Sequence, residues 1–522
     1  EKQRKQSKTM NNNINQLKWG AILSYFSMGI SLAIGLVYTP LMIRLLGKNE
    51  FGLYSTVSST ISMLGILNLG FGSGYIRYYA KYKRNNDMDA IYRLNGLFLM
   101  IFIVIGLVAA VCGTFLSFHL DWIFDEGLTG AEYQKARILM LMLTVNMAIS
   151  FPMSVFTNII NANEKFVFLK IFGIITTVIG PMVNVPILLM GYKSVALVAS
   201  SLVLGLIYHV VTVYYVLVVL KNKFVFRSLE KGIFVGLFSY TIFIFLNTII
   251  DQINWNIDKL LLARFIGTAE VAVYSVGYSL YAHYMQFSTA ISGIFTPCIH
   301  RIVNETQDDK ETQRVQLTEL FTRVGRVQFL ILALIATGII FFGQVFILDY
   351  WAGPGYENSY FVTLLLTIPA SIALIQNIGI EIQRAMNIHQ FRSVIYAVMA
   401  IVNLMLSIYL CQIYGAVGSA IGTAISLILA NGFIMNIFYQ KKCNIDMFYF
   451  WKEIMKLCRG LVIPIGVGII MHKYIRVMSI LSFLVSVLVY MIVYIVSMWI
   501  FGMNQYEKNL IGKPFKKLKY RG

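Results

Sequence analysis

The sequence predicts an all-α protein that crosses a membrane many times, and three observations carry this prediction. The 522 residues are 58% hydrophobic and only 13% charged, which is too little charge to cover a soluble domain of this size. Apolar runs of more than about 18 residues recur along the chain, each long enough to cross about 30 Å of hydrocarbon as a helix. Lysine and arginine gather in alternate loops between these runs, as the positive-inside rule requires.

We expect about fourteen membrane-spanning helices. In order they cover residues 19–43, 51–80, 92–118, 135–160, 166–190, 194–220, 233–263, 270–300, 320–348, 359–386, 391–413, 416–440, 449–472 and 477–502. With the N-terminus in the cytoplasm, the inner loops hold about four times as many lysines and arginines as the outer loops. This topology places both termini in the cytoplasm, and the protein in the cell membrane.

Residues 38–83 organise the chain, because part of their pattern returns in residues 259–284. Four pairs share one offset of 220 residues: Arg44 and Arg264, Gly47 and Gly267, Tyr54 and Tyr274, and Ser55 and Ser275. A weaker echo links Asn184, ahead of GYKSVAL, to Asn403, ahead of YGAVGSA. An internal duplication of this kind predicts two similarly oriented six-helix lobes around a central cavity, the parallel-repeat plan of many transporters.

The duplication and the charge pattern together predict a division of the chain into six parts. They are a basic, flexible cytoplasmic N-terminus (1–18), an N-terminal six-helix lobe (19–220), a cytoplasmic linker (221–232), a C-terminal six-helix lobe (233–440), two additional spans (441–502) and a basic cytoplasmic tail (503–522).

Composition also limits the classes of function. The net charge of +19 could indicate nucleic acid in a soluble protein, but here the positive-inside pattern explains it, and we expect no nucleic-acid partner. The five cysteines form no CxxC pair, so neither a disulfide framework nor a metal site is indicated. The sequence contains no GxxxxGK[ST], GxSxG or HExxH pattern. We therefore expect no cofactor and no enzyme activity.

The expected seventh span is the most polar. Asn247, Asp251, Asn254 and Asp258 are spaced as i, i+4, i+7 and i+11 and so form one stripe down a helical face, with Lys259 beside it. A carboxylate in hydrocarbon costs several kcal/mol even on mild scales, so these groups are expected to face a hydrated cavity and contact substrate. The simpler interpretation is that Asp258 and Lys259 lie at the outer boundary in water, while Asp251 pairs locally.

Three further places are candidates for function. Ser27 and Ser31 occupy the equivalent face of the first span at the offset of 220, and they are candidate substrate contacts. Arg77 follows the small-residue run LGFGSG, where a guanidinium suits phosphate recognition; the alternative is that it reaches out to lipid headgroups. Glu381 and Arg384 lie one helical turn apart and form either an ion pair or a gate.

The first two spans carry a resemblance to a known family. The pattern P-x-x-x-R-x-L-G-x-x-x-[FY]-G-x-Y-S occurs here as Pro40, Arg44, Leu46, Gly47, Phe51, Gly52, Tyr54 and Ser55. Together with LNLGFGSGYIRYYAKYK and NIDKLLLARFIGTAEVAVYS, this pattern resembles the polysaccharide-transporter (repeat-unit or O-antigen-type flippase) branch of the multidrug/oligosaccharidyl-lipid/polysaccharide exporter superfamily.

The resemblance implies a function. Members of this branch move an oligosaccharide on a polyprenyl pyrophosphate carrier from the inner to the outer leaflet by alternating access, in a cavity lined by the first, second, seventh and eighth spans. It implies a lipid-linked oligosaccharide as substrate, with membrane lipids and glycan-assembly enzymes as candidate partners, and we expect a monomer. Two alternatives stay open: a cation-coupled multidrug antiporter of the same superfamily, and a membrane-embedded glycan polymerase or acyltransferase.

Overall fold

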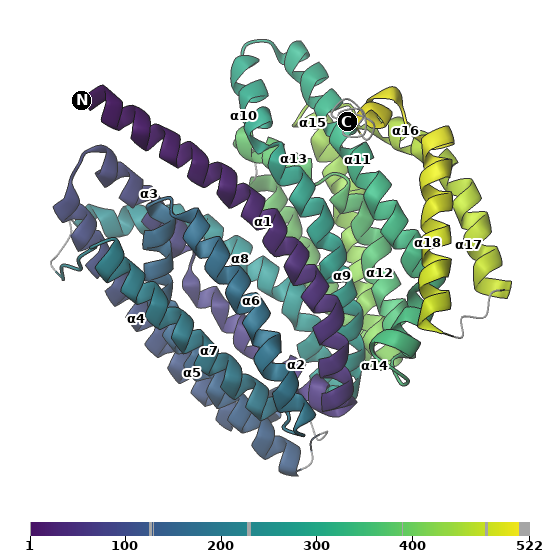
Figure 1. The fold of residues 1–522 in the computed structure, drawn as a ribbon, viewed down its shortest axis with the longest axis horizontal. Helices are drawn as coiled ribbons and strands as arrows, with labels where there is room; N and C mark the ends of the chain where they lie inside the picture. The colour runs from purple at the N-terminus through teal and green to yellow at the C-terminus, as the bar shows by residue number, and fades with distance from the viewer. Residues whose placement is uncertain are drawn as a thin grey trace, which may run out of the picture. The chain divides into compact units, whose positions relative to one another are not determined.

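A computed structural model describes residues 2–124, 128, 130–226, 231–388, 390–474 and 479–510. Within these residues the regular structure is helical, without a strand, as the sequence predicts (Figure 1). The chain divides into two compact units, Glu1–Ala272 and Val273–Gly522. Helix α9 crosses the boundary between them.

Unit 1 consists of long helices joined by short turns. They are α1 (Lys2–Leu46), α2 (Lys48–Met63), the 3-10 helix η1 (Leu64–Asn68), α3 (Phe71–Arg84), α4 (Met88–Phe118), the 3-10 turn η2 (Leu120–Trp122), α5 (Gly130–Ala162), α6 (Phe166–Leu189), α7 (Ser194–Tyr214), the π-helical turn η3 (Tyr215–Val219), α8 (Lys231–Phe265) and the start of α9 (Thr268–Ile294). Because α1 begins at Lys2, the residues before the first expected span continue it as a helix, and their flexibility stays a prediction.

Packing in unit 1 is closest between α4 and α5, α1 and α6, and α5 and α7, and α8 packs against α2, η1 and α3 (Figure 1). Lipid tails are as apolar as leucine, so association depends on small residues that let helices approach and on internal hydrogen bonds. Gly106 of α4 lies against the carbonyl of Ala148 in α5. In the core of α3, α4 and α5, the buried Tyr75 donates a hydrogen bond of 2.6 Å to Asn95.

Unit 2 contains the rest of α9 and the helices that follow it. They are α10 (Thr296–Glu305), α11 (Lys310–Val345), the π-helical turn η4 (Phe346–Trp351), α12 (Glu357–Leu374), α13 (Ile378–Ala385), α14 (Gln390–Leu427), the π-helical segment η5 (Ile428–Ile434), α15 (Met435–Lys441), α16 (Met447–Cys458), the 3-10 turn η6 (Arg459–Leu461), α17 (Val462–Tyr474), α18 (Ile480–Ser497) and the π-helical turn η7 (Met498–Gly502).

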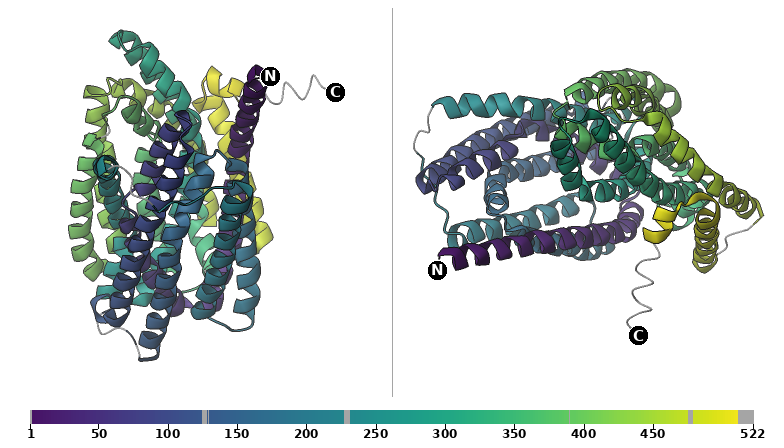
Figure 2. Two further views of the ribbon diagram at one scale, coloured as in Figure 1. Left: turned by 90° about the vertical axis from the view of Figure 1, so that its left-hand side faces the viewer. Right: turned by 90° about the horizontal axis from the view of Figure 1, so that it is seen from above.

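The last two helices of unit 2 lie side by side and pack on α11 (Figure 2). An aromatic cluster joins them: the rings of Phe342 in α11 and Tyr490 in α18 meet edge to face, with centroids 5.5 Å apart. Gly468 of α17 lies directly against the ring of Phe341, in a space that a side chain would fill. Helices α17 and α18 are therefore packed against α11 through this cluster.

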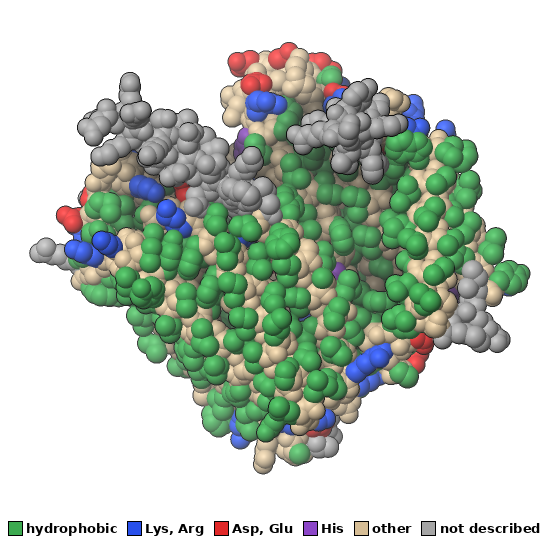
Figure 3. Space-filling model, in the orientation of Figure 1, with side chains coloured by type: hydrophobic (Ala, Val, Ile, Leu, Met, Phe, Trp, Pro, Cys, Tyr) green, Lys and Arg blue, Asp and Glu red, His purple; other side chains and the backbone are tan. Residues whose placement is uncertain are grey.

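Ten segments of the described residues are long and apolar enough to span a membrane. Hydrophobic side chains cover most of the face shown in Figure 3, and few charged side chains lie among them. The segment Gln390–Lys441 contains 52 residues, about 78 Å of helix, which is more than twice the thickness of the hydrocarbon layer. Its backbone breaks at Gly415, with φ 57° and ψ −135°, between the two spans expected there. The protein is a multi-pass membrane protein, and the number fourteen stays a prediction.

Four of the expected spans are interrupted. Those over 270–300 and 359–386 are divided into α9 and α10 and into α12 and α13. The span expected over 51–80 is divided into α2, η1 and α3, because Leu69 (φ 52°) and Gly70 (φ 72°) take left-handed backbone conformations that end the helix. The span expected over 449–472 is divided into α16 and α17 by the turn η6.

Candidate functional site

The polar stripe of α8 runs from an exposed to a buried environment. Asp251 is exposed, Asn247 and Asn254 are half-buried, and Asp258 is 1% exposed. Its neighbour Lys259 is half-buried. The amide and carboxylate groups of the stripe therefore differ in exposure along one helix.

The adjacent face of α8 packs inside unit 1. Gln252 approaches Gly65 of η1 and accepts a hydrogen bond of 2.6 Å from Asn256. Because residues one position apart on a helix point about 100° apart, the contact of Gln252 with η1 turns Asp251 toward a different side of the helix. This orientation is consistent with the exposure of Asp251.

The first span carries the serines that the sequence places opposite this stripe. Ser27 and Ser31 are both half-buried on α1, which packs against α6. Further along α1, Tyr38 is hydrogen-bonded to Asn184 of α6, and Asn184 accepts a hydrogen bond of 2.5 Å from Ser200 of α7.

Unit 2 contains a related polar cluster around Asn403, the counterpart of Asn184 in the internal duplication. Asn403, which is 2% exposed, accepts hydrogen bonds of 3.3 Å from Ser407 and from Thr423. In the duplicated pattern Asn403 corresponds to Asn184 (403−184 = 219). At the same offset Ser200 corresponds to Ser419 (419−200 = 219), which lies one helical turn before Thr423. Each unit therefore joins two consecutive helical segments through an asparagine at the same place, which supports the duplication.

Arg77 lies on the exposed side of α3. Tyr75 and Tyr79 of the same helix are buried in the core of unit 1, and Arg77, between them in sequence, is exposed. The Arg77 side chain therefore lies on the side of α3 that is turned away from this core.

Glu381 and Arg384 form an ion pair on α13, with 2.6 Å between Glu381 Oε1 and Arg384 Nη1. The glutamate side chain is 18% exposed and that of the arginine is 62% exposed. An exposed pair of this spacing contributes little to stability. A gating role for it stays a prediction.

A carboxylate that the sequence analysis did not single out joins three helices of unit 1. Glu50, in the first turn of α2, accepts a hydrogen bond of 2.6 Å from Lys135 of α5. It also accepts hydrogen bonds from the backbone N–H of Ser194, at 3.2 Å, and from the Ser194 hydroxyl, at the start of α7. Burial raises the pKa of the Glu50 carboxyl, but the bonds from Lys135 and Ser194 outweigh burial and lower it below its usual value.

The duplicated pattern could have identified Glu50 from the sequence. Glu50 and Glu270 share the offset of 220 found for the four pairs above (270−50 = 220), and each lies in the first turn of its helix. An acidic residue in the first turn also interacts favourably with the helix dipole.

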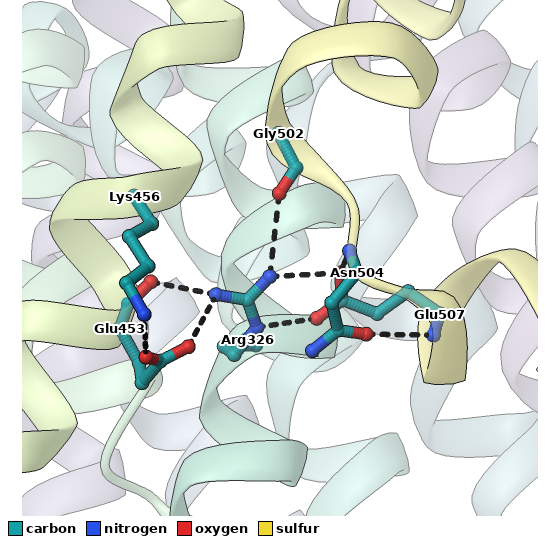
Figure 4. Close-up of polar contacts among 6 residues, drawn as sticks. All are labelled: Arg326, Glu453, Lys456, Gly502, Asn504 and Glu507. Atoms are coloured by element: carbon teal, nitrogen blue, oxygen red, sulfur yellow. Dashed lines mark hydrogen bonds and ion pairs between the residues drawn. The ribbon is translucent and has the colours of Figure 1, made fainter.

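A second group that the sequence did not single out is Arg326 of α11. Its side chain is 3% exposed. It donates hydrogen bonds to Glu507 from Nε at 2.5 Å and from Nη2 at 2.9 Å, and to Glu453 of α16 from Nη1 at 3.2 Å. It also donates to the carbonyl of Gly502, at 3.3 Å (Figure 4). This network ties α11, α16 and the end of the chain together.

An apolar groove of about 510 Å³ lies beside this network. Its walls include Leu334 and Ile335 of α11 and Tyr494 and Ile495 of α18, and Glu507 lies at its edge. Among the described residues no group of three or more His, Cys, Asp or Glu side chains is placed to hold a metal ion.

The fold and these polar helices define a multi-pass membrane transporter built from duplicated lobes. A family model described as "Polysaccharide biosynthesis protein" matches residues 18–303, and the chain belongs to this family, in its polysaccharide-transporter branch. The chain is therefore a transporter and not an enzyme. The matched region contains α8 and Arg77.

Individual proteins show the same relationship. A "Putative O-antigen transporter" of Shigella flexneri is 22% identical over 439 residues, which are 81% of this chain and 98% of that protein. The solved structure "Lipid II flippase MurJ, inward closed conformation" matches with a TM-score of 0.70 and 14% identity over 95% of this chain and 99% of that one. An inward-facing multidrug resistance MATE family transporter of the MOP superfamily matches with a TM-score of 0.61 and 13% identity over 77% of this chain and 95% of that one. These structures support the fold.

Proposed function

We propose that this protein moves a polyprenyl-pyrophosphate-linked oligosaccharide, a repeat unit of a cell-surface polysaccharide, from the inner to the outer leaflet of the cytoplasmic membrane. The observation that carries the proposal is membership of the polysaccharide biosynthesis family over residues 18–303. A hydrated, anionic headgroup cannot cross hydrocarbon alone, so the protein supplies a polar path while the lipid tail stays in the bilayer. The lobes then alternate between two states of comparable stability.

Each candidate side chain has a role in this proposal. The exposed guanidinium of Arg77 binds the pyrophosphate, because arginine donates paired hydrogen bonds to phosphate oxygens. Asn247, Asp251 and Asn254 bind sugar hydroxyls, with Ser27 and Ser31 on the first span; Asp258 and Lys259 continue the path. This list of contacts matches the chemistry that a carbohydrate site needs, namely a few convergent polar groups on an otherwise apolar scaffold.

The internal duplication suggests a role for each part of the chain. We propose that residues 19–220 and 233–440 form the two moving lobes, that 221–232 link them in the cytoplasm, and that 441–502 are two added spans. Residues 1–18 and 503–522 then lie in the cytoplasm, as the distribution of lysine and arginine favours. The protein acts as a monomer and receives its substrate from glycan-assembly enzymes. The apolar groove between α11 and α18, the second of these added spans, is a surface that hydrocarbon chains can contact.

The experiment that tests this function compares glycan export with drug export in cells that depend on the protein. We expect Arg77→Gln and Asp251→Asn to reduce surface polysaccharide at least about tenfold, since each removes a charge-assisted contact. Arg84→Gln, on the exposed last turn of the same helix α3, serves as the matched control and should leave export unchanged. Loss of drug resistance with normal surface polysaccharide in the Asp251→Asn cells would favour the antiporter alternative and overturn the proposal.

A further inference from the structure

Helix α16 has two faces of different chemistry. Met447, Phe450, Ile454 and Leu457 are buried, and the rings of Phe450 and Phe321 of α11 meet edge to face with centroids 4.9 Å apart. The other side, which we call the outward face of α16, is exposed. It consists of Phe448, Tyr449, Lys452, Met455, Lys456 and the adjoining Arg459.

The outward face combines large apolar side chains with cations. Phe448 is 84% exposed and Met455 is 62% exposed. Residues 448, 452, 455 and 459 follow one another as i, i+4, i+7 and i+11 and therefore form one stripe. An exposed mixture of aromatic, thioether and basic side chains on one helical face is typical of helices that lie in the interface of a membrane.

The acidic residues of α16 are turned away from the outward face. Glu453 accepts hydrogen bonds from the buried Arg326 and from Lys456. Asp446 caps the helix by accepting from the backbone N–H of Tyr449 at 2.9 Å, and it lies 3.6 Å from Arg314 of α11. The exposed Lys441 and Lys442 precede the helix. The surface around α16 is consequently rich in cations.

The position of α16 in the chain indicates what this surface meets. The turn η6 leads from α16 directly into α17, and Met447–Tyr474 is one of the segments apolar enough to span a membrane. The outward face therefore lies where the chain passes from water into hydrocarbon. In the orientation proposed above this is the cytoplasmic leaflet, which carries the anionic lipids.

We propose that the outward face of α16 binds the headgroups of anionic phospholipids. Lys452 and Arg459 of this face contact the phosphates together with Lys442, which precedes the helix, while Phe448 and Met455 enter the boundary between headgroups and acyl chains. Arg326 fixes the orientation of α16, because it donates a hydrogen bond to Glu453 on the side of the helix opposite the outward face. Lipid is favoured over an acidic protein partner because the face is continuous with a membrane span and carries apolar side chains among its cations.

The test measures lipid binding to the purified full-length protein by native mass spectrometry, with phosphatidylglycerol and phosphatidylcholine as probes. The variant K442Q/K452Q/R459Q removes three cations and leaves the bond between Lys456 and Glu453. The matched control K81Q/K83Q/R84Q removes three exposed cations from the last turns of α3. The melting temperature of each variant checks that it is folded.

We expect the native protein to bind phosphatidylglycerol at least about tenfold more tightly than phosphatidylcholine, because each cation near an anionic surface contributes about fivefold in affinity before screening by salt. The α16 variant should lose most of this preference, and the control should keep it. Equal binding of the two lipids by the native protein, or equal losses in both variants, would overturn the proposal.

A third probe separates the two kinds of partner. A polyglutamate peptide that binds the native protein but not the α16 variant, while phosphatidylglycerol binding is the same in both, would assign the face to an acidic protein and contradict the proposal. Failure of polyglutamate to compete with phosphatidylglycerol supports it. Binding is measured without transport, so a failure here is distinct from a failure of the proposed function.

Discussion

Arg326 and Glu507 are 181 residues apart in sequence and form a doubly hydrogen-bonded ion pair, with 2.5 Å from Nε to Oε1 and 2.9 Å from Nη2 to Oε2. Their side chains are 3% and 2% exposed. A buried charge is tolerated only when it is paired and hydrogen-bonded. The pair therefore holds the segment after the last span against α11 in one geometry (Figure 4).

Removing this arginine should destabilise the protein strongly. Arg326→Met leaves the carboxylates of Glu507 and Glu453 without their shared cation, and breaking a buried pair in this way costs about 3–5 kcal/mol. Arg323→Met is the matched control, since Arg323 pairs with Glu319 on the exposed side of the same helix and such a pair contributes less than about 1 kcal/mol. The free energy of unfolding in detergent solution measures both. Equal losses for the two variants would contradict the assigned role of Arg326.

Glu50 should make the stability of unit 1 depend on pH. Its pKa is lowered in the folded protein, so its contribution to stability is present above the unfolded value of about 4.5. It is lost as the pH falls through the lower folded value. The melting temperature of Glu50→Gln should therefore be below that of the native protein at pH 7, and the difference should shrink below about pH 4.5. A difference that stays constant from pH 7 to pH 3.5 would show that the charge of Glu50 does not stabilise the fold.

Gly52, part of the family pattern, permits a close approach between two helices. A Cβ atom at this position would collide with the backbone carbonyl of Thr268, at the start of α9. Gly52→Ala should cost about 1–3 kcal/mol of stability, because backbone has to move to admit the methyl group. Gly29→Ala on α1 is the control, since nothing lies within 4 Å of its Cβ position. The melting temperatures of the two variants measure this cost. A Gly52→Ala protein as stable as the native one would show that the close approach of the two helices does not need glycine at this position.

The fold was predictable from the sequence because hydrocarbon allows few alternatives. Backbone groups in lipid must be hydrogen-bonded within the segment, so long apolar runs become helices. The offset of 220 residues likewise anticipates the related clusters around Asn184 and Asn403. The ends of helices were less predictable: Leu69 and Gly70 interrupt the stretch 51–80, which the sequence predicts as one span, because left-handed backbone conformations end the helix there.

The buried ion network was not predictable from charge counts. A count of charges does not distinguish Arg326 from Arg323, three residues earlier, since both lie near the start of the same expected span. The two differ because Glu453 and Glu507, 127 and 181 residues further on, are folded against one side of α11 and not the other. Glu50 could have been found, since its duplicate Glu270 repeats the offset of the four pairs that the sequence revealed.

Substitutions on the polar stripe of α8 should reduce transport more than substitutions on the face of α8 that packs inside unit 1. Asp251 is exposed and Asn256 points into unit 1, where it is bonded to Gln252. In a transport assay we expect Asp251→Ala to reduce the rate at least about tenfold, and Asn256→Ala to lower stability by about 1 kcal/mol with a smaller effect on rate. The initial rate per folded molecule separates the two effects. A larger loss of rate in Asn256→Ala than in Asp251→Ala would place the functional face elsewhere on α8.

The proposed transport of lipid-linked oligosaccharides across a bilayer can be measured with purified components. The purified protein is reconstituted into liposomes loaded with a polyprenyl-pyrophosphate oligosaccharide, and the headgroups that reach the opposite leaflet are removed by an added impermeant glycosidase. We expect cleavage to proceed beyond the half that is accessible in protein-free liposomes, and Arg77→Gln to slow it while Arg84→Gln does not. Cleavage that stops at the same fraction with and without the protein would contradict the account.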